Sequence, residues 1–545
     1  MAAARPLIRP AFPSPAPARS PWLFPAVLAA ILALASLLPY LLAWWLTPPG
    51  HHFAGFFFIA DDATTYLAKM RQGADGSWLW NDPYTSEPHG GVFLFAFYLL
   101  AGHVAALIHL PLIAVYHLAG VSGAFVLVLS IDRLAHRTLP LADRRLGLAL
   151  AVLGSGLGFA VQAAGNPGLL GLRLQALDLH LPELSGWYSI LAIPHFVWAA
   201  ALMVLALLGL GAISARPSAW LVIRTGAILS ALAAIHPQMV AVLLLVWCAS
   251  QALLLTWGRR PAPAALLGEA LAFAIPSPLL VYNAWILYRD PTIAAWARQW
   301  RHQPPDPLSL ALSLGVPLAA AAIAIAVGLR RREPTLAPLL VWPPLVLTIL
   351  YLPNVANIQR RLLDAIYVPV GLLAAVGLRH LLAHLQAPRA RLLRRLLVTA
   401  SCFSSVLVLA IAIRFASGAF PEIYVGDGQW HAMAWISSHH QPGDRALSSP
   451  GVGLYLPADS GVSVYVGHYS ETLDYFTKIQ VADSMLRATT APDRLRAFLS
   501  REGITLLYWG PQERAGRDFS PSGEPYLHRV YDAGGVQIYR VDPQD

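Results

Sequence analysis

This 545-residue chain has little charge, almost no lysine and only two cysteines. Cys248 and Cys402 both lie in apolar runs, which excludes a disulfide framework and gives no indication of a cysteine-based metal cluster. Charged residues make up 12% of the chain, against roughly 25% in soluble domains. The glycine-rich fingerprints of nucleotide-binding loops are missing, so nucleotide hydrolysis is not expected. Every cation except Lys69 and Lys478 is arginine, a compositional bias from which we infer no function.

Hydrophobic residues, in contrast, make up 57% of the chain, and the mean hydropathy is +0.55. Lipid must therefore be the solvent for much of the folded surface. An apolar run at 23–47 is followed by eleven more between residues 91 and 416, each near the ~20 residues that a helix needs to cross hydrocarbon. The first run is too long for a signal-peptide core, so we expect an uncleaved first span. The predicted fold class is an α-helical polytopic membrane protein with about 11–13 transmembrane helices and a small C-terminal α/β soluble domain.

The predicted domain organisation has three parts. It consists of a disordered cytoplasmic arm at 1–22, a polytopic transmembrane domain at 23–416 with a first external loop at 48–90, and an extracytoplasmic α/β domain at 420–545. In the last of these, the pattern predicts helices at 429–438 and 493–501 and strands at 462–466, 504–509, 526–531 and 536–541.

Charge is distributed unevenly along the chain. Residues 1–416 hold 28 basic and 14 acidic residues, and residues 417–545 hold 10 and 15. The basic excess is thus a property of the membrane part and is explained by arginines in loops that fix orientation, so a nucleic-acid partner is not indicated. These arginines cluster in loops near 133–145, 216–224, 259–260, 330–332 and 389–395, all of which we expect to be cytoplasmic.

This orientation places the loops around 166–189, 289–306 and 353–362, and the tail, on the outer side. One conflict remains. With the N-terminus inside and the first loop outside, residues 91–131 must cross an odd number of times, yet they are predicted to form two spans. One of the two would then be re-entrant or interfacial, or the first basic loop breaks the rule.

An acidic pair, Asp61 and Asp62, follows the first span directly. Charges at a membrane surface are costly to desolvate, so they are candidates for function. A carboxylate here could act as a general base toward an acceptor hydroxyl, or could hold a divalent cation such as Mg²⁺ or Mn²⁺. Alternatively, the pair stabilises the N-terminus of an interfacial helix. The same long polar loop contributes Lys69, Glu87 and His89 as candidate substrate-binding residues.

Two further groups of candidates lie in loops predicted to face outward. Glu183, Trp187, His195 and His236 combine carboxylate, aromatic and imidazole groups, which would suit substrate binding or, equally, interfacial helix capping. Arg360 and Arg361 are unexpected on the outer face, and paired guanidinium groups bind phosphate well. The alternative for this pair is an ion pair with Asp364 or with lipid headgroups.

Together, the first span, the acidic external loop, the many spans and the outward tail resemble the GT-C superfamily of integral-membrane glycosyltransferases. The resemblance covers the architecture end to end, and its local motif is Asp61-Asp62. It implies an inverting transferase that uses a polyprenyl-phosphate-linked sugar, with an acidic first-loop residue as base or metal ligand. We carry that role onto Asp61 and Asp62. Arg360 and Arg361 would suit the lipid phosphate by chemistry alone.

The tail is also similar to those of uncharacterised bacterial members of this superfamily, which implies a multi-pass protein of the bacterial inner (plasma) membrane. The expected partners are the lipid bilayer, the lipid-linked donor and an acceptor that is a glycan, a lipid or a protein. Two alternatives stay open. A secondary transporter would carry ionisable groups within its spans, for which Glu269 is the clearest candidate. The other is a non-catalytic membrane scaffold with an external binding domain.

Overall fold

The computed structural model describes residues 22–169, 171–299, 302–353, 359–418, 423–515 and 517–542. Except for Trp22, the predicted N-terminal arm lies outside this part of the chain. The chain forms two compact units. Unit 1 comprises residues 1–39, 117–282 and 301–413, and unit 2 comprises residues 40–116, 283–300 and 414–545.

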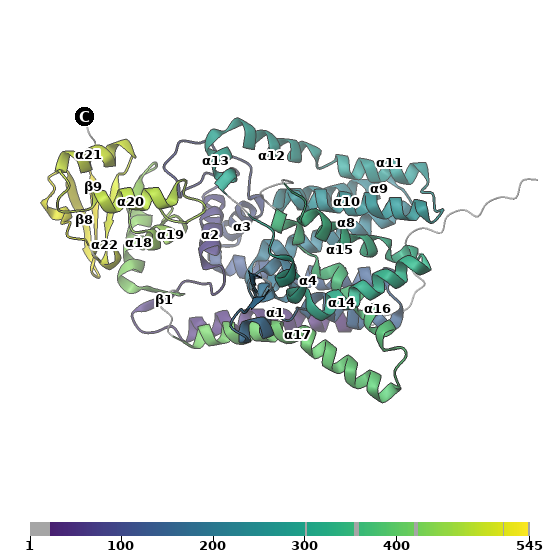
Figure 1. Cartoon of the computed structure of the whole chain (residues 1–545). Coiled ribbons are helices and arrows are strands. Elements are labelled where there is room, and N and C mark those ends of the chain that lie inside the picture. The colour runs from purple at the N-terminus through teal and green to yellow at the C-terminus, as the bar shows by residue number, and fades with distance from the viewer. Residues whose placement is uncertain are drawn as a thin grey trace, which may run out of the picture. The chain divides into compact units, whose positions relative to one another are not determined.

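The described part of the chain contains eight helices that are long and apolar enough to cross a membrane. They span Leu23–Trp45, Leu112–Thr138, Leu141–Ala163, Pro194–Ala215, Pro237–Thr256, Pro263–Arg289, Pro307–Arg331 and Ala387–Ser417. Four shorter apolar helices accompany them, at Ala96–Ile108, Ala219–Ile235, Pro334–Leu350 and Tyr367–Leu382. These helices correspond one by one to the predicted apolar runs, and the predicted polytopic helical fold is confirmed (Figure 1).

Unit 1 is built almost entirely of these helices around one large apolar core. Within it, α8 packs against α9, and α14 and α5 pack against α16. Its elements, some of which extend into unit 2, are α1 (Leu23–Trp45), α4 (Leu112–Thr138), α5 (Leu141–Leu153), α6 (Gly158–Ala163), β2 (Gly168–Leu169), β3 (Leu172–Arg173), η1 (Leu177–Leu179), η2 (Pro182–Leu184), α7 (Gly186–Ala192), α8 (Pro194–Ala215), α9 (Ala219–Ile235), α10 (Pro237–Thr256), α11 (Pro263–Ala274), α12 (Ser277–Arg289), α14 (Pro307–Arg331), η3 (Pro334–Leu336), α15 (Ala337–Leu350), η4 (Gln359–Leu363), α16 (Tyr367–Leu382) and α17 (Ala387–Ser417).

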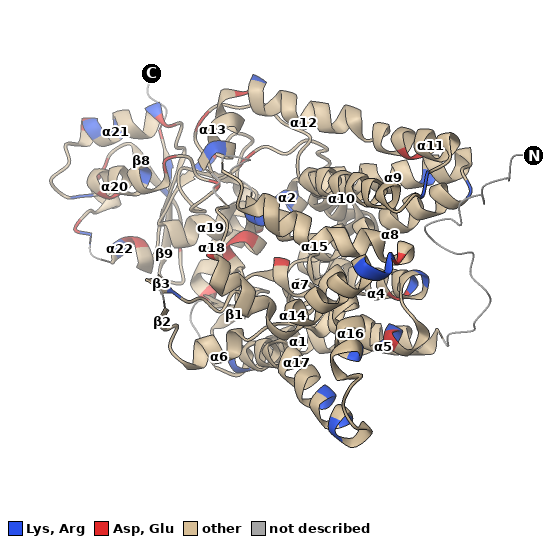
Figure 2. Cartoon of the chain, turned by 45° about the vertical axis from the view of Figure 1, so that its right-hand side comes forward, with Lys and Arg blue, Asp and Glu red and all other residues tan. Residues whose placement is uncertain are grey.

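Basic side chains of unit 1 gather at helix ends. In Figure 2 the ribbon is blue near the labels α4, α5 and α16 and tan over most of the helices. Arg137, Arg144 and Arg331 line one cavity of about 270 Å³. The loops near 133–145 and 330–332 therefore lie at the same end of this unit, as the charge pattern predicts.

Helix α3 (Ala96–Ile108) is the shorter of the two helices in the region 91–131, for which two spans were predicted but an odd number of crossings is needed. It has 13 residues and is therefore about 20 Å long, shorter than the ~30 Å hydrocarbon core. It packs instead against α2 (Ala60–Ala74). The approach is so close that a Cβ atom on Gly102 would lie 1.8 Å from the carbonyl oxygen of Met70. Helix α3 is therefore too short to cross the hydrocarbon core by itself, which agrees with the alternative that one of the two predicted spans is re-entrant or interfacial. The number of crossings in 91–131 stays a prediction.

Unit 2 combines the first loop with the tail. Its other elements are β1 (His51–Phe53), α13 (Pro291–Gln299), β4 (Tyr424–Gly426), α18 (Asp427–His439), β5 (Arg445–Leu447), α19 (Pro450–Asp459), β6 (Ser463–Val464), α20 (Tyr475–Met485), α21 (Pro492–Arg501), β7 (Leu506–Trp509), α22 (Pro511–Arg514), η6 (Pro521–Gly523), β8 (Leu527–Ala533) and β9 (Val536–Val541). The small α/β tail is confirmed, although α19 and α20 were not predicted.

The sheet of the tail has five strands in the order β6-β5-β7-β9-β8. Strand β5 is parallel to β6 and β7, whereas β9 is antiparallel to β7 and β8. Strand β1 of the first loop pairs antiparallel with β4, which begins the tail. The first loop is thus joined to the tail by backbone hydrogen bonds as well as by packing of α2 against α19.

Candidate functional site

The acidic pair lies in the first turn of α2. This helix begins after Ile59, whose φ of 52° is an unusual left-handed conformation for a β-branched residue. No side chain caps the helix there, and Asp61 and Asp62 place negative charge beside its first N–H groups, which is favourable. Asp61 is exposed, whereas Asp62 is half-buried. The capping interpretation therefore has a physical basis, but it does not account for what surrounds Asp62.

Asp62 faces a histidine from the tail. Its Oδ1 lies 3.3 Å from Nε2 of His468, whose side chain is fully buried. Nδ1 of His468 accepts hydrogen bonds from the backbone N–H groups of Ser470 and Glu471. In the neutral ring the proton must therefore be on Nε2, the atom next to Asp62. We call Asp61, Asp62 and His468 the acidic group.

Two turns further along α2, Lys69 is almost completely buried. Its Nζ lies 2.7 Å from Oε1 of Glu471 and 3.2 Å from Oγ1 of Thr65. Nε1 of Trp296 donates to the other carboxylate oxygen of Glu471. The ring of Phe95 lies 4.4 Å from the ammonium nitrogen, and Trp80 and Tyr66 complete an aromatic cage. Because both charges are buried and bonded, Lys69 fixes α2 against the tail.

The tail segment 467–474 supplies both of these contacts, His468 to Asp62 and Glu471 to Lys69. It is fastened to the first loop by Thr472, which donates to the carbonyl oxygen of Tyr84 at 2.8 Å. His468 and Glu471 of this segment are both buried, and both contact α2.

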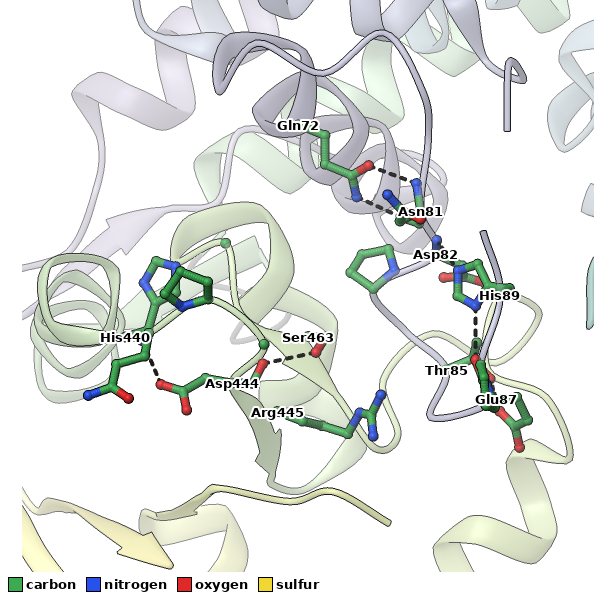
Figure 3. Close-up of a pocket in the computed structure, with 16 residues that line it drawn as sticks. Gln72, Asn81, Asp82, Thr85, Glu87, His89, His440, Asp444, Arg445 and Ser463 are labelled. Carbon is green, nitrogen blue, oxygen red and sulfur yellow. Dashed lines mark hydrogen bonds between the residues drawn. The ribbon is translucent and has the colours of Figure 1, made fainter. Parts of the chain in front are cut away.

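Glu87 and His89 follow in the same loop. Burial opposes ionisation of Glu87, but hydrogen bonds from Lys478 and Thr85 outweigh it and lower the pKa of this carboxyl group. Nε2 of His89 accepts from the backbone N–H of Asp82, and its Nδ1 lies 2.9 Å from the carbonyl oxygen of Glu87. Both residues line a cavity of about 370 Å³ between the first loop and the tail turn 440–445 (Figure 3).

In unit 1, Arg360 and Arg361 share a carboxylate. Oε1 of the buried Glu183 lies 3.3 Å from Nε of Arg360 and 3.2 Å from an Nη of Arg361. The guanidinium group of Arg361 also stacks over Phe196 at 4.9 Å. Two cations around one anion leave a net charge of +1. We call Glu183, Arg360 and Arg361 the basic group.

The expected alternative partner of these arginines, Asp364, is engaged elsewhere. Its Oδ2 lies 2.8 Å from Nδ1 of His236. The ring of His195 lies 4.9 Å from that of His236, so the two predicted histidines are brought together. Trp187 is buried in the apolar core of unit 1. Binding roles for these residues stay predictions.

The predicted site residues thus fall into two sets. Unit 2 holds Asp61, Asp62, Lys69, Glu87 and His89, and unit 1 holds Glu183, Trp187, His195, His236, Arg360 and Arg361. Convergence of both sets on one cavity stays a prediction. So does a Mg²⁺ or Mn²⁺ ion at Asp61 and Asp62. Among the described residues no three His, Cys, Asp or Glu side chains converge as metal ligands, so we derive no step through a metal.

No sequence-family model matches the chain, and no curated protein matches it in sequence. Solved structures do match. The oligosaccharyltransferase of Archaeoglobus fulgidus aligns with a TM-score of 0.55 at 12% identity, covering 96% of this chain and 74% of that one. Arabinofuranosyltransferase AftD from Mycobacteria aligns with 0.51 at 16%, covering 95% and 40%.

ArnT from Cupriavidus metallidurans, solved with bound undecaprenyl phosphate, aligns with a TM-score of 0.51 at 14% identity, covering 97% of this chain and 100% of that one. All three neighbours are membrane proteins of the GT-C type. The predicted GT-C-like fold is therefore confirmed, and at these identities the likeness is one of fold.

Proposed function

We propose that this chain is an integral-membrane glycosyltransferase that moves a sugar from a polyprenyl-phosphate-linked donor to an acceptor hydroxyl with inversion. The observation that carries the proposal is the acidic group within a GT-C-like fold. A first-loop carboxylate, Asp62, is held beside a buried histidine from the far end of the chain. Such pre-positioning is costly to build and is typical of residues that act on a substrate.

The proposed step is a single displacement. A carboxylate of the acidic group takes the proton of the acceptor hydroxyl, and the acceptor oxygen forms a bond to the anomeric carbon. The bond from that carbon to the phosphate oxygen breaks, and the lipid phosphate leaves with the electron pair. Asp61 is exposed and can reach an acceptor. Asp62 is half-buried, and its Oδ1 lies 3.3 Å from Nε2 of His468. We assign the base to this pair without dividing the role between them.

The departing phosphate needs positive charge. The basic group of unit 1 has the chemistry to bind a phosphate, because Glu183 neutralises only one of its two arginines. That it meets the acidic group in one site stays a prediction. The orientation proposed from the charge pattern places the first loop at 48–90 and the tail at 420–545 outside the cytoplasm. A bacterial inner membrane would be the location of such an enzyme.

The main candidate residue of the transporter alternative is bonded within the protein. Glu269 accepts hydrogen bonds from Ser214, Trp247 and Gln251, so its oxygens are satisfied by protein. These bonds explain how Glu269 is tolerated inside unit 1. An assay of uptake and transfer decides between the transporter and the enzyme.

The test is a transfer assay with purified protein in liposomes that contain radiolabelled undecaprenyl-phosphate-linked mannose, arabinose or glucose. The acceptors are a crude cell-envelope glycan fraction and a lipid extract. We expect label to move to one acceptor, with release of undecaprenyl phosphate. Solute uptake into the liposomes without transfer would instead identify a transporter. If neither transfer nor uptake were detected, the scaffold alternative would be favoured.

A further inference from the structure

We propose that the cavity of Figure 3 is a subsite for a neutral glycan, the acceptor of the transfer reaction. This inference rests on the proposed function and adds the chemical class of the acceptor. The cavity has a volume of about 370 Å³ and is lined by residues of unit 2 alone. That volume lies within the range of roughly 300–1,000 Å³ typical of small-molecule sites.

The first-loop wall of the cavity is preorganised. The side chain of Gln72 donates to the carbonyl oxygen of Asn81 and accepts from its N–H, at 2.7 and 3.0 Å. His89 bridges the backbone of Asp82 and Glu87. Trp80 and Val92 exchange two backbone hydrogen bonds at the base of this loop. A wall fixed in this way loses little entropy when a ligand binds.

The carboxylates of the lining are neutralised within the protein. Asp444 receives two hydrogen bonds from Arg540, at 3.0 and 3.1 Å, and Glu87 pairs with Lys478. Burial, reinforced by the charge of Glu471, raises the pKa of Asp82 well above its usual range, so this group holds a negative charge less readily than an exposed carboxyl. A metal cation therefore finds little free negative charge among these carboxylates. The positive charge of Arg445 in the same lining is opposed by Glu502 and Glu87, so a neutral polar ligand fits better than an ion of either sign.

Groups that can bind hydroxyls line the cavity from both the first loop and the tail. Asn81 comes from the first loop and Gln441 from the tail turn, and both are exposed. Neither side-chain amide has a hydrogen bond to another described residue. Nε of Arg445 is a buried donor without a partner in the described part of the chain. Amides donate and accept, as do sugar hydroxyls, so this set matches the alternating polarity of a glycan.

The test measures binding directly, using the full-length protein in nanodiscs and saturation-transfer NMR. The probes are four neutral disaccharides: mannobiose, galactobiose, arabinobiose and maltose. We expect at least one to bind the parent protein, and the double variant Asn81→Ala, Gln441→Ala to weaken it at least tenfold. Ser500→Ala, on the exposed side of α21, is the matched control and should bind as the parent does.

Two results would overturn the subsite. The parent could bind none of the disaccharides at millimolar concentration, or the double variant could bind as tightly as the parent. Because the experiment measures binding and not transfer, the subsite and the proposed enzymatic activity can be rejected independently. Disaccharide binding without sugar transfer would reject the enzyme and keep the subsite. Transfer with an acceptor KM that the double variant leaves unchanged would reject the subsite and keep the enzyme.

Discussion

The acidic group and the basic group are built on the same plan with opposite charge. In each, a buried residue holds a more accessible charged one. His468 is fully buried and its partner Asp62 is 22% exposed, whereas Glu183 is 1% exposed and its partner Arg360 is 28% exposed. The comparison shows that burial separates the two roles. In the proposed mechanism the buried member would fix geometry, and the more accessible member would meet the acceptor hydroxyl in the acidic group and the donor phosphate in the basic group.

The largest expected effect is on the acidic group. Asp61→Asn combined with Asp62→Asn keeps size and removes both negative charges, so the proposed base is lost. We expect the transfer rate to fall at least 100-fold, since general base catalysis contributes about 10²–10⁴-fold. Initial rates of label transfer measure it. Asp75→Asn, at the other end of α2, is the matched control and should retain the parental rate. A double variant that kept more than half of the activity would exclude the pair as base.

The next prediction concerns the ion pair that supports the acidic group. Lys69→Ala leaves Glu471 buried without its countercharge, which should lower the free energy of unfolding by about 3–5 kcal/mol. Arg501→Ala removes an exposed ion pair with Glu502 and should cost less than about 1 kcal/mol. Denaturant unfolding of the purified proteins compares them. Equal losses in the two variants would mean that the Lys69 pair does not anchor α2.

For the basic group we predict an effect on the donor. Arg360→Gln and Arg361→Gln each remove one of the two cations around Glu183, so the net positive charge is lost. The donor KM should rise about tenfold, as for the loss of one charge-assisted hydrogen bond. Inhibition by added undecaprenyl phosphate should weaken in parallel. Arg487→Gln, an exposed arginine of the tail, serves as control. A donor KM within twofold of the parent in both variants would count against phosphate binding here.

A smaller effect is expected from the residue that positions Asp62. His468→Ala should lower kcat about fivefold with little change in acceptor KM. This corresponds to a loss of about 1 kcal/mol of transition-state stabilisation, because the contact that helps to position Asp62 is removed. His468→Gln places an amide N–H near the position of Nε2 and should recover most of the rate. If His468 were purely structural, His468→Gln would give no such rescue. The transfer rates of both variants would then fall only as far as their thermal stabilities fall.

The smallest effect on transfer is expected from Asp459, an acid of unit 2 outside the acidic group, whose substitution should change the pH dependence of stability only. Burial raises the pKa of Asp459 to about 6, although the charge of Arg71 opposes this. In the unfolded chain the value is about 3.9. Between these values the folded protein holds more protons, so stability falls as the pH rises from about 4 to 6 and is constant above.

Asp459→Asn should remove this decline and stabilise the protein at pH 7.5 by about 2–3 kcal/mol, with transfer unaffected. Unfolding measured between pH 4.5 and 7.5 for parent and variant tests it. If the variant declined as steeply as the parent, another group would be responsible.

The helices of unit 1 were predictable because a helix that crosses lipid needs about 20 consecutive apolar residues. Such a run can be recognised without knowing the rest of the chain. The same rule does not say how many times residues 91–131 cross, because α3 packs one side closely on α2 and leaves Leu100 and Leu107 exposed. Composition does not distinguish apolar residues that pack against protein from those that contact lipid.

The acidic group was half predictable. Asp61 and Asp62 were recognisable from their place after the first span, but His468 and Glu471 were not assigned. Glu471 bonds to Lys69 across 402 residues of sequence, and no local pattern encodes such a pairing. One signal was available. Both lysines of this arginine-rich chain are buried in ion pairs with first-loop or tail acids, Lys69 with Glu471 and Lys478 with Glu87. A compact ammonium group suits these enclosed positions better than a guanidinium fork.

The most direct test of the central claim is the stereochemistry of transfer. NMR of the product formed from a donor of known anomeric configuration shows which face of the sugar is attacked. A single displacement by an acceptor that the acidic group deprotonates predicts the opposite configuration in the product. Retained configuration would require two displacements and would contradict the proposed role of Asp61 and Asp62.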